Sequence, residues 1–169
     1  MKRKPRKIII LGDERLHEKS PPVESYGDEL GELAEDMFRT LSAKKGLGLA
    51  AVQVGVLTRV FITQLPEDGQ RVFVNPTIIE TSEELVEIEE GCLSVPRMYE
   101  SLRRPAQVRV QAFTVKGKPY TLEAGGMLAR VIQHELDHLD GILFIDRLDE
   151  AVKARIVKSF RVPAGVRPI

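Results

Sequence analysis

The stretch Gln133-His134-Glu135-Leu136-Asp137-His138-Leu139-Asp140-Gly141 decides how the rest of this chain is interpreted. The chain has three histidines, and two of them, His134 and His138, stand here four residues apart. On an α-helix these positions lie on one face, so the two imidazoles can bind one metal ion from a single element. Glu135 would then lie beside the metal, where it can accept a proton from a water molecule. The alternative is a solvated helix face, and a third metal ligand would decide against it.

Length and composition indicate one globular domain. The chain has 169 residues, 43% of them apolar, and its 25 basic residues balance its 25 acidic ones. This profile excludes a disordered chain and does not suggest DNA binding. The basic start, residues 1–7, precedes an apolar run of only four residues, which is too short for a signal peptide or a membrane span. A single cysteine is compatible with a reducing cytoplasm. We therefore expect one cytoplasmic catalytic domain over 1–169, with loose ends at 1–7 and 161–169.

Hydrophobic periodicity predicts an α+β fold. Apolar residues at spacings of three and four predict helices over 27–45, 127–140 and 149–160. Alternating or β-branched runs predict strands over 8–11, 59–63, 70–75, 76–80, 85–89, 107–115 and 120–123. The second and third of these strands flank a Pro-Glu-Asp-Gly turn and predict a hairpin. We expect mostly antiparallel sheets packed around the central helix that carries the H-E-x-x-H motif, with an N-terminal amphipathic helix and a C-terminal helix.

Two further segments have competing interpretations. Gly46-Leu47-Gly48-Leu49-Ala50-Ala51 matches a weak dinucleotide-binding pattern, but it follows a helix and precedes strand-like sequence, which is the reverse of the order that such a loop requires. A tight connection of small residues is the simpler interpretation, although it leaves Gln53 without a role. The acid-rich run over 80–90 indicates a solvated face rather than a second metal site, because its acids mostly alternate outward.

The third ligand of a catalytic metal site must come from elsewhere in the chain. Phe144 occupies the place where a metzincin has its third histidine, and Glu150 follows the motif too closely to serve as in a thermolysin-like site. His17 lies in the N-terminal arm, where a surface position is the simpler explanation. Cys92 remains, and its thiolate would be a good soft ligand. Its alternative is a small buried hydrophobic residue.

Three separated motifs give the chain a resemblance to a known family. They are Gly46-Leu47-Gly48-Leu49-Ala50-Ala51-Val52-Gln53, Glu90-Gly91-Cys92-Leu93-Ser94 and Gln133-His134-Glu135-Leu136-Asp137-His138. In this order and spacing, the chain resembles a peptide deformylase, which removes the N-formyl group from nascent polypeptides. The resemblance covers Ile8 to about Leu148. It departs from the family's usual Asp-Pro-x-Leu-Arg stretch at Asp13-Glu14-Arg15-Leu16-His17, and no resemblance is found after Phe160.

The resemblance implies a role for each motif. It implies that one divalent metal ion, with water in the fourth position, is bound by Cys92, His134 and His138. Glu135 would be the general base, and the Gln53 side chain and the Leu93 backbone N–H would donate to the developing oxyanion. The family usually uses Fe²⁺, and Zn²⁺, Ni²⁺ or Co²⁺ suit the same ligands. Another H-E-x-x-H metallohydrolase acting on peptide or amide bonds, or a non-catalytic metal-binding module, is the competing function.

The resemblance also implies where partners bind. An N-formylmethionyl peptide would lie as an added strand between Gly46-Leu47-Gly48 and the loop after Cys92. Met127, Arg130 and Val131 share the face of His134 and would line the methionine pocket, with ordinary core packing as the alternative for the two apolar residues. The basic C-terminal end would dock on the ribosome, with a solvated helix face as the alternative. Its basic residues are Lys153, Arg155, Lys158, Arg161 and Arg167.

Overall fold

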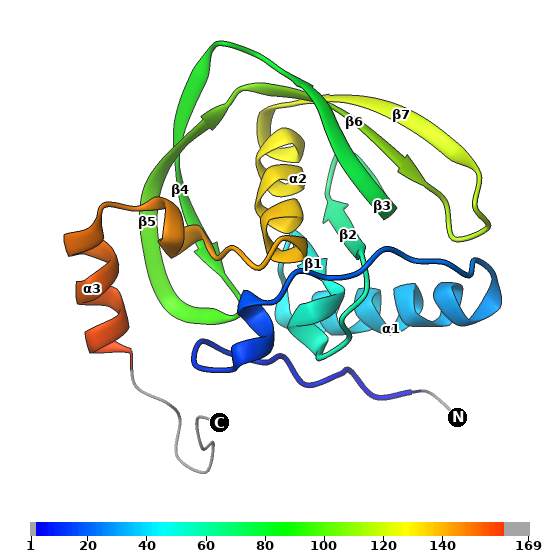
Figure 1. The fold of residues 1–169 in the computed structure, drawn as a ribbon, viewed down its shortest axis with the longest axis horizontal. Coiled ribbons are helices and arrows are strands. Elements are labelled where there is room, and N and C mark those ends of the chain that lie inside the picture. The colour runs from blue at the N-terminus through cyan, green and yellow to red at the C-terminus, as the bar shows by residue number, and fades with distance from the viewer. Residues whose placement is uncertain (1–2, 161–169) are drawn as a thin grey trace.

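The computed structural model describes residues 3–160 and confirms an α+β fold with antiparallel sheets and three α-helices. A five-stranded sheet has the strand order β1-β2-β3-β6-β7, and β4 and β5 form a separate hairpin. Helix α2 lies between the sheet and the hairpin, as Figure 1 shows. The helices are α1 Asp28–Lys44, α2 Gly126–Leu139 and α3 Glu150–Ser159, with 3₁₀ turns at Glu14–His17, Ala51–Val54 and Phe144–Arg147. The strands are β1 Gly48–Ala50, β2 Val60–Leu65, β3 Gly69–Thr81, β4 Leu85–Cys92, β5 Val95–Pro105, β6 Gln107–Phe113 and β7 Pro119–Gly125.

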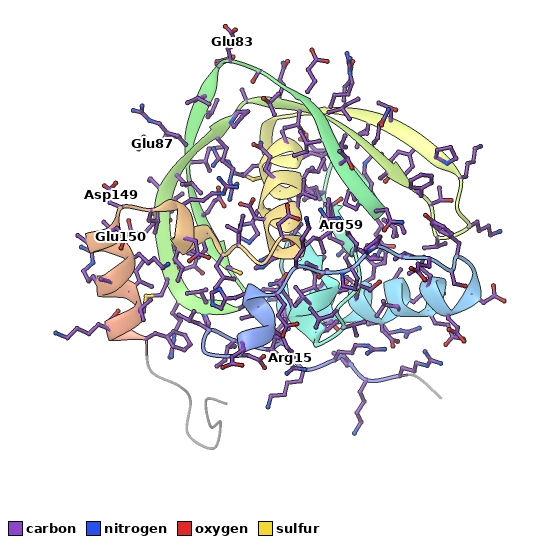
Figure 2. All side chains as sticks on the ribbon, viewed as in Figure 1. Arg15, Arg59, Glu83, Glu87, Asp149 and Glu150 are labelled. Atoms are coloured by element: carbon purple, nitrogen blue, oxygen red, sulfur yellow. The ribbon has the colours of Figure 1, made fainter. Side chains whose placement is uncertain are left out.

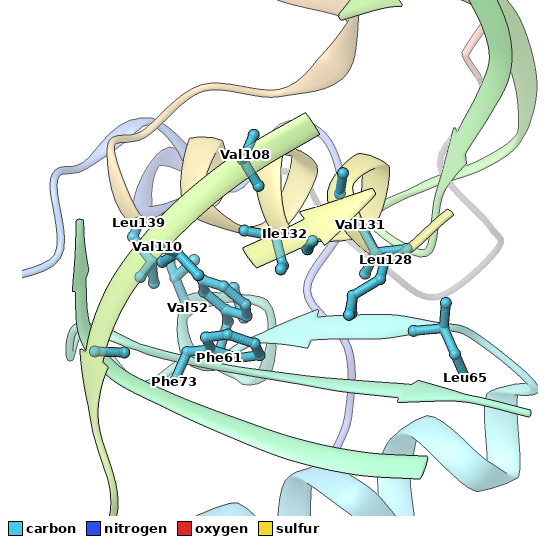
Figure 3. Close-up of a cluster of buried hydrophobic side chains, with 14 residues drawn as sticks. Val52, Phe61, Leu65, Phe73, Val108, Val110, Leu128, Val131, Ile132 and Leu139 are labelled. Atoms are coloured by element: carbon cyan, nitrogen blue, oxygen red, sulfur yellow. The ribbon is translucent and has the colours of Figure 1, made fainter. Parts of the chain in front are cut away.

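Both faces of the large sheet are covered. Adjacent side chains of β2 point to opposite sides, so this strand contributes to two hydrophobic clusters. On one side Phe61 stacks on Phe73, with ring centroids 4.5 Å apart, in the cluster that contains Leu128 and Ile132 of α2 (Figure 3). On the other side Ile62 belongs to the cluster that contains Met37 of α1. The sheet therefore holds α2 by burial of apolar surface, the strongest general force in folding.

The C-terminal end of α2 is fixed by contacts from two other segments. The Arg59 guanidinium donates to the Leu139 carbonyl oxygen at 3.1 Å and pairs with Asp140 at 2.9 Å. Gly141 follows with φ +74°, and a β-carbon there would lie 2.5 Å from the carbonyl oxygen of His17. Glycine is required at this position, because it combines the left-handed conformation with the close approach of the N-terminal arm.

Most of the predicted elements are confirmed, but several details of the strands differ from the prediction. The strands predicted at 70–75 and 76–80 are one strand, β3, whose pairing with β6 is irregular near Asn75, a residue with φ +49°. Strand β5, over Val95–Pro105, was not predicted. Val52-Gln53-Val54 looked strand-like in the sequence, but it forms a 3₁₀ turn instead.

The N-terminal arm also differs in detail from the prediction. Residues 8–11 are extended and bond to Gln53 and Ser94 through single backbone N–H groups, but they form no strand. The start of the chain, predicted to be loose, is fixed at Arg6, whose side chain pairs with Asp36 at 2.9 Å. The expectation for residues 1–2 and 161–169 lies outside the described residues. Within residues 3–160, no helix is long and apolar enough to cross a membrane.

Candidate metal centre

The structure brings three potential metal ligands together from two elements. Helix α2 carries His134 and His138 on one face, and Cys92 ends strand β4. One ligand atom from each residue lies within 4.8 Å of the others. The Cys92 Sγ and His138 Nε2 atoms are 3.3 Å apart, and both imidazoles are buried. Cys92 thus meets the two histidines, in the arrangement that a three-ligand metal site would need.

The polar atoms around this cluster fit a bound cation. The Nδ1 atom of His134 is 2.9 Å from Glu90 Oε1, which leaves Nε2 as its ligand atom. Among the described residues, the buried Glu135 Oε2 and His138 Nδ1 have no hydrogen-bond partner. A soft thiolate with two imidazoles suits Fe²⁺, Zn²⁺ and their neighbours. A divalent metal with a water ligand would give Glu135 Oε2 a partner, so the residues present fit a metal site.

Burial and neighbouring groups shift the protonation of this cluster. Burial opposes a charge on His134, but hydrogen bonds to Cys92 and Glu90 outweigh it and raise its pKa. Burial, together with the nearby His134, lowers the pKa of His138. Burial raises the pKa of Glu135 to about 7, close to the value that suits a general base at neutral pH. In the metal-free site, these shifts favour a protonated His134 and a neutral His138.

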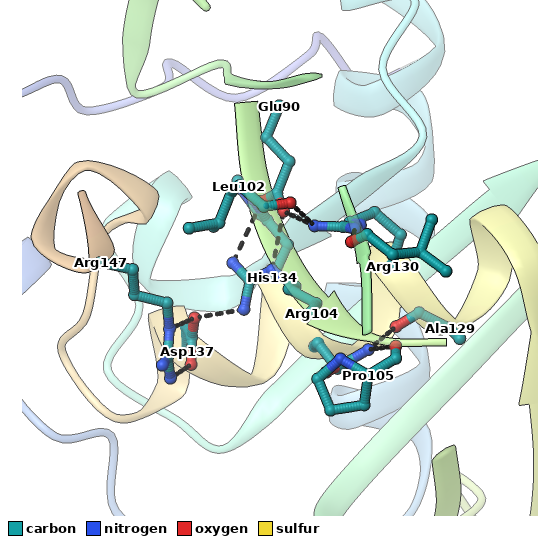
Figure 4. Close-up of polar contacts among 11 residues, drawn as sticks. Glu90, Leu102, Arg104, Pro105, Ala129, Arg130, His134, Asp137 and Arg147 are labelled. Carbon is teal, nitrogen blue, oxygen red and sulfur yellow. Dashed lines mark hydrogen bonds and ion pairs between the residues drawn. The ribbon is translucent and has the colours of Figure 1, made fainter. Parts of the chain in front are cut away.

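A buried network of charged groups supports His134 from behind (Figure 4). Glu90 accepts hydrogen bonds from His134 at 2.9 Å, from Arg104 at 2.7 Å and from Arg130 at 2.7 Å. Arg104 also donates to Asp137 at 2.9 Å, and Asp137 lies one turn along α2 from His134. Burial alone would raise the pKa of Glu90, but the bonds from His134 and Arg104 hold it well below its usual range. The network joins the β4-β5 hairpin to α2, the helix that carries both histidines.

Gln53 reaches the cluster from the 3₁₀ turn Ala51–Val54. Its side-chain oxygen accepts from the Ala50 N–H at 2.9 Å, which orients the amide. Its nitrogen donates to Ser94 Oγ at 3.1 Å and lies 3.7 Å from Cys92 Sγ. Strand β1 comes this close because Gly48 has no side chain: a β-carbon there would lie 2.7 Å from Glu135 Oε1. Gln53 therefore presents a hydrogen-bond donor beside Cys92.

A cleft of about 980 Å³ opens over the metal cluster. The residues predicted to bind substrate all line it: Gly46, Leu47, Gly48, Met127, Arg130 and Val131. Leu93, predicted to donate its backbone N–H, lines it as well. Arg130 is 5% exposed, and its guanidinium is bound to Glu90 and to the Leu102 and Val86 carbonyl oxygens. It therefore shapes the cleft wall, and its charge is already compensated.

Other candidates lie outside the cluster. His17 and Glu150 are exposed, and neither belongs to the described metal-ligand group; Figure 2 places Glu150 on α3. Phe144, which rules out a metzincin ligand set, lies against His134 with ring centroids 6.2 Å apart. In the basic C-terminal end, Lys153 pairs with Asp146 at 2.8 Å and Arg155 with Glu100 at 2.9 Å, whereas Lys158 is exposed. Arg161 and Arg167 lie outside the described residues.

Glu90 lies in the site, although the sequence pattern predicted that its side chain would be exposed. It was assigned with the acid-rich run to a solvated face, and its neighbours Glu83 and Glu87 do point outward (Figure 2). Glu90 itself is 6% exposed. The signal was present, because Val86, Ile88 and Glu90 follow the two-residue period of the strand and share its inward face.

Comparisons with known proteins give matches over most of the chain. The sequence profile described as polypeptide deformylase matches residues 5–154. The peptide deformylase of Brucella suis is 43% identical over 164 residues, which cover 95% of this chain and 94% of the relative. The peptide deformylase of Neisseria gonorrhoeae is 48% identical over 151 residues, covering 88% of this chain and 90% of the relative.

Solved structures show the same fold. The peptide deformylase of Ehrlichia chaffeensis in complex with actinonin matches with a TM-score of 0.89 and 36% identity, covering 92% of this chain and 95% of that one. A peptide deformylase from Legionella pneumophila matches with a TM-score of 0.86 and 40% identity, covering 91% and 92% of the two chains.

The buried network yields a prediction about stability. Replacing Glu90 by Gln leaves the buried Arg130 guanidinium without a countercharge and leaves Arg104 paired with Asp137 alone, so we expect a loss of about 3–5 kcal/mol in the free energy of unfolding. Glu87→Gln is the matched control, because Glu87 forms an exposed pair with Arg103 across the same two strands, and exposed pairs contribute less than about 1 kcal/mol. Urea unfolding of both metal-free variants measures the difference. Similar small losses in the two variants would contradict the role given to Glu90.

Proposed function

We propose a reaction for this chain on one premise: the chain belongs to the polypeptide deformylase family. The chain hydrolyses the formamide bond of N-formylmethionyl peptides and releases formate and a free amino terminus. One observation carries this proposal, namely the meeting of Cys92, His134 and His138 beneath a cleft whose lining also includes Glu135 and Gln53. The catalytic unit spans the chain and acts in the cytoplasm, where formylated nascent chains arise.

Cys92, His134 and His138 would hold the metal ion, with Fe²⁺ as the native ion and Zn²⁺, Ni²⁺ or Co²⁺ as substitutes that the ligand set accepts. When bound, a divalent metal supplies Lewis acidity toward the formyl oxygen and lowers the pKa of a water molecule. Glu90 orients the His134 ring through Nδ1, and such supporting bonds govern metal affinity.

Glu135 moves the proton. Its Oε2 atom is buried, has no partner among the described residues and lies at the floor of the cleft. A carboxylate whose pKa lies near neutrality can accept a proton from the attacking water and then return it to the leaving amine. Because the amine leaves as a neutral group once protonated, the same residue serves both halves of the reaction.

Gln53 and Leu93 would stabilise the charge that develops on the formyl oxygen. The Gln53 amide is held by Ala50, and its nitrogen faces the cluster. Together with the Leu93 backbone N–H, it would form an oxyanion hole beside the metal. Preorganised donors of this kind need no rearrangement as the charge forms.

The cleft would bind the peptide in an extended form. Gly46-Leu47-Gly48 and the loop after Cys92 would supply its walls, and Met127 and Val131 would contact the methionine side chain. Arg130 supports the pocket through Glu90. Docking on the ribosome would use the C-terminal end, where Lys158 is the described basic residue of α3 that has no ion pair.

Glu135→Gln tests the assignment of the base. The variant should still bind about one metal ion per chain, because its ligands are intact, but it should lose about 100- to 10,000-fold in kcat/KM for formate release from formyl-Met-Ala-Ser. Glu150→Gln, on exposed α3, is the control and should keep wild-type activity. Full activity in the Glu135 variant would indicate a metal-binding module or another mechanism, and cleavage of internal peptide bonds would indicate a different metallohydrolase.

Gln53→Glu tests the oxyanion hole. Glutamate keeps the oxygen that accepts from Ala50 but cannot donate a hydrogen bond when ionised. We expect kcat to fall about 100- to 1,000-fold, with metal content close to that of the wild type. The melting temperature should fall, because Gln53 is 1% exposed and an ionised carboxylate is costly to bury there. Gln53→Ala should lose activity to a similar extent. If kcat were unchanged in both variants, the role given to Gln53 would be wrong.

A further inference from the structure

We propose that the mouth of the cleft selects formylated peptides that carry an acidic side chain soon after methionine, an inference that rests on the proposed function. The mouth is the set of exposed residues that line the cleft. Four of them are cationic and come from three segments: Lys7 in the N-terminal arm, Lys44 and Lys45 at the end of α1, and Arg97 in β5.

These four cations are available to a ligand. None of them forms an ion pair with any residue in 3–160. Three further arginines line the cleft but are already paired: Arg6 with Asp36 at 2.9 Å, Arg15 with Asp13 at 2.6 Å and Arg130 with Glu90 at 2.7 Å. The basic character of the mouth is therefore carried by the four unpaired side chains.

The acidic groups of the cleft do not balance the four cations of the mouth. Glu90 is buried and bound to arginines, Glu135 is buried at the floor, and Asp13 is paired with Arg15. Glu89 is the remaining acid of the lining, and it is exposed. The chain as a whole has a formal net charge of +0, so this excess of positive charge is a local feature of the mouth.

The backbone supports a role for one of these cations. In the described part of the chain, three non-glycine residues have positive φ: Lys45 at +56°, Asn75 at +49° and Arg97 at +65°. Lys45 is the C-cap of α1, where a left-handed residue is ordinary, and the Asn75 side chain is held by hydrogen bonds. Arg97 lies in β5 where the pairing with β4 shifts between Gly91 and Cys92, and it lines the cleft. Bulges of this kind redirect side chains next to active sites.

The position of the two cations matches the path of the substrate. The formyl group must reach the cluster of Cys92 and the histidines, so the rest of the peptide leaves through the mouth. Lys45 directly precedes the wall formed by 46–48, and Arg97 follows Cys92 in the opposite wall. An extended peptide advances about 3.3 Å per residue, so the residues that follow methionine pass between these cations.

The expected size of the selectivity follows from the exposure of the four cations to solvent. Exposed charges act weakly in water and are screened within about 10 Å at 0.1 M salt, so selectivity needs several cations acting together. We expect kcat/KM for a glutamate-containing peptide to exceed that for its lysine counterpart by about 10-fold at low ionic strength. Screening should reduce this ratio to about 2-fold or less in 0.5 M salt.

The test uses formyl-Met-Ala-X-Ser amides, in which X is Glu, Gln or Lys and the amide removes the terminal carboxylate. A second set places X directly after methionine. Formate release by the metal-loaded enzyme gives kcat/KM for each peptide at about 20 mM and 500 mM salt. The expected order is Glu, then Gln, then Lys, with the differences vanishing at high salt. Equal values for Glu and Lys, with rapid turnover, would overturn the inference alone, whereas no turnover of any peptide would overturn the proposed function.

A matched pair of variants locates the effect. Lys45→Gln and Arg97→Gln together remove two of the four unpaired cations and should lower the Glu-to-Lys ratio toward 1. Lys116→Gln with Lys118→Gln removes exposed charge away from the cleft and should leave the ratio at the wild-type value. Near-native melting temperatures show that the variants are folded. A ratio that falls equally in both variants would assign the selectivity to overall charge and would contradict a role for the mouth.

Discussion

The buried carboxylate of Glu90 is the group on which the site depends. It joins the hairpin that carries Cys92 to the helix that carries both histidines, through His134, Arg104 and Arg130. Removing such charges from water is costly, and only nearly complete hydrogen bonding offsets that cost. The network therefore tolerates few arrangements of hairpin and helix, and the ones that it tolerates place the three ligand atoms together.

The rest of the fold positions this unit and opens it to substrate. The apolar core under α2 fixes one side of the helix, and Arg59 and Gly141 fix its C-terminal end. Gly48 lets strand β1 approach Glu135, which brings Gln53 to the cluster. The extended arm then completes the cleft wall, so the reacting groups lie at the floor and the unpaired cations at the mouth.

The parts of the structure that could be predicted from the sequence are those set by local pattern. Helical periodicity located α1 and α2, and the H-E-x-x-H spacing placed two histidines on one face of α2, with Glu135 beside them. Strand β5 was missed because its sequence is charged and bounded by prolines, and its pairing with β4 depends on distant residues. The side chain of Glu90 was predicted to be exposed because acids usually are, although its place in the two-residue alternation of β4 indicated the inward face. Cys92 was the candidate that remained for the third ligand, and the hairpin places it beside His138.

The central claim is that Cys92, His134 and His138 bind one metal ion. X-ray absorption spectroscopy of the zinc-loaded protein tests it most directly, because sulfur and nitrogen scatter at different distances. The account predicts one sulfur at about 2.3 Å and two imidazole nitrogens at about 2.0–2.1 Å from the metal, with the sulfur contribution lost in Cys92→Ala. A coordination shell of nitrogen and oxygen alone in the wild-type protein would contradict it.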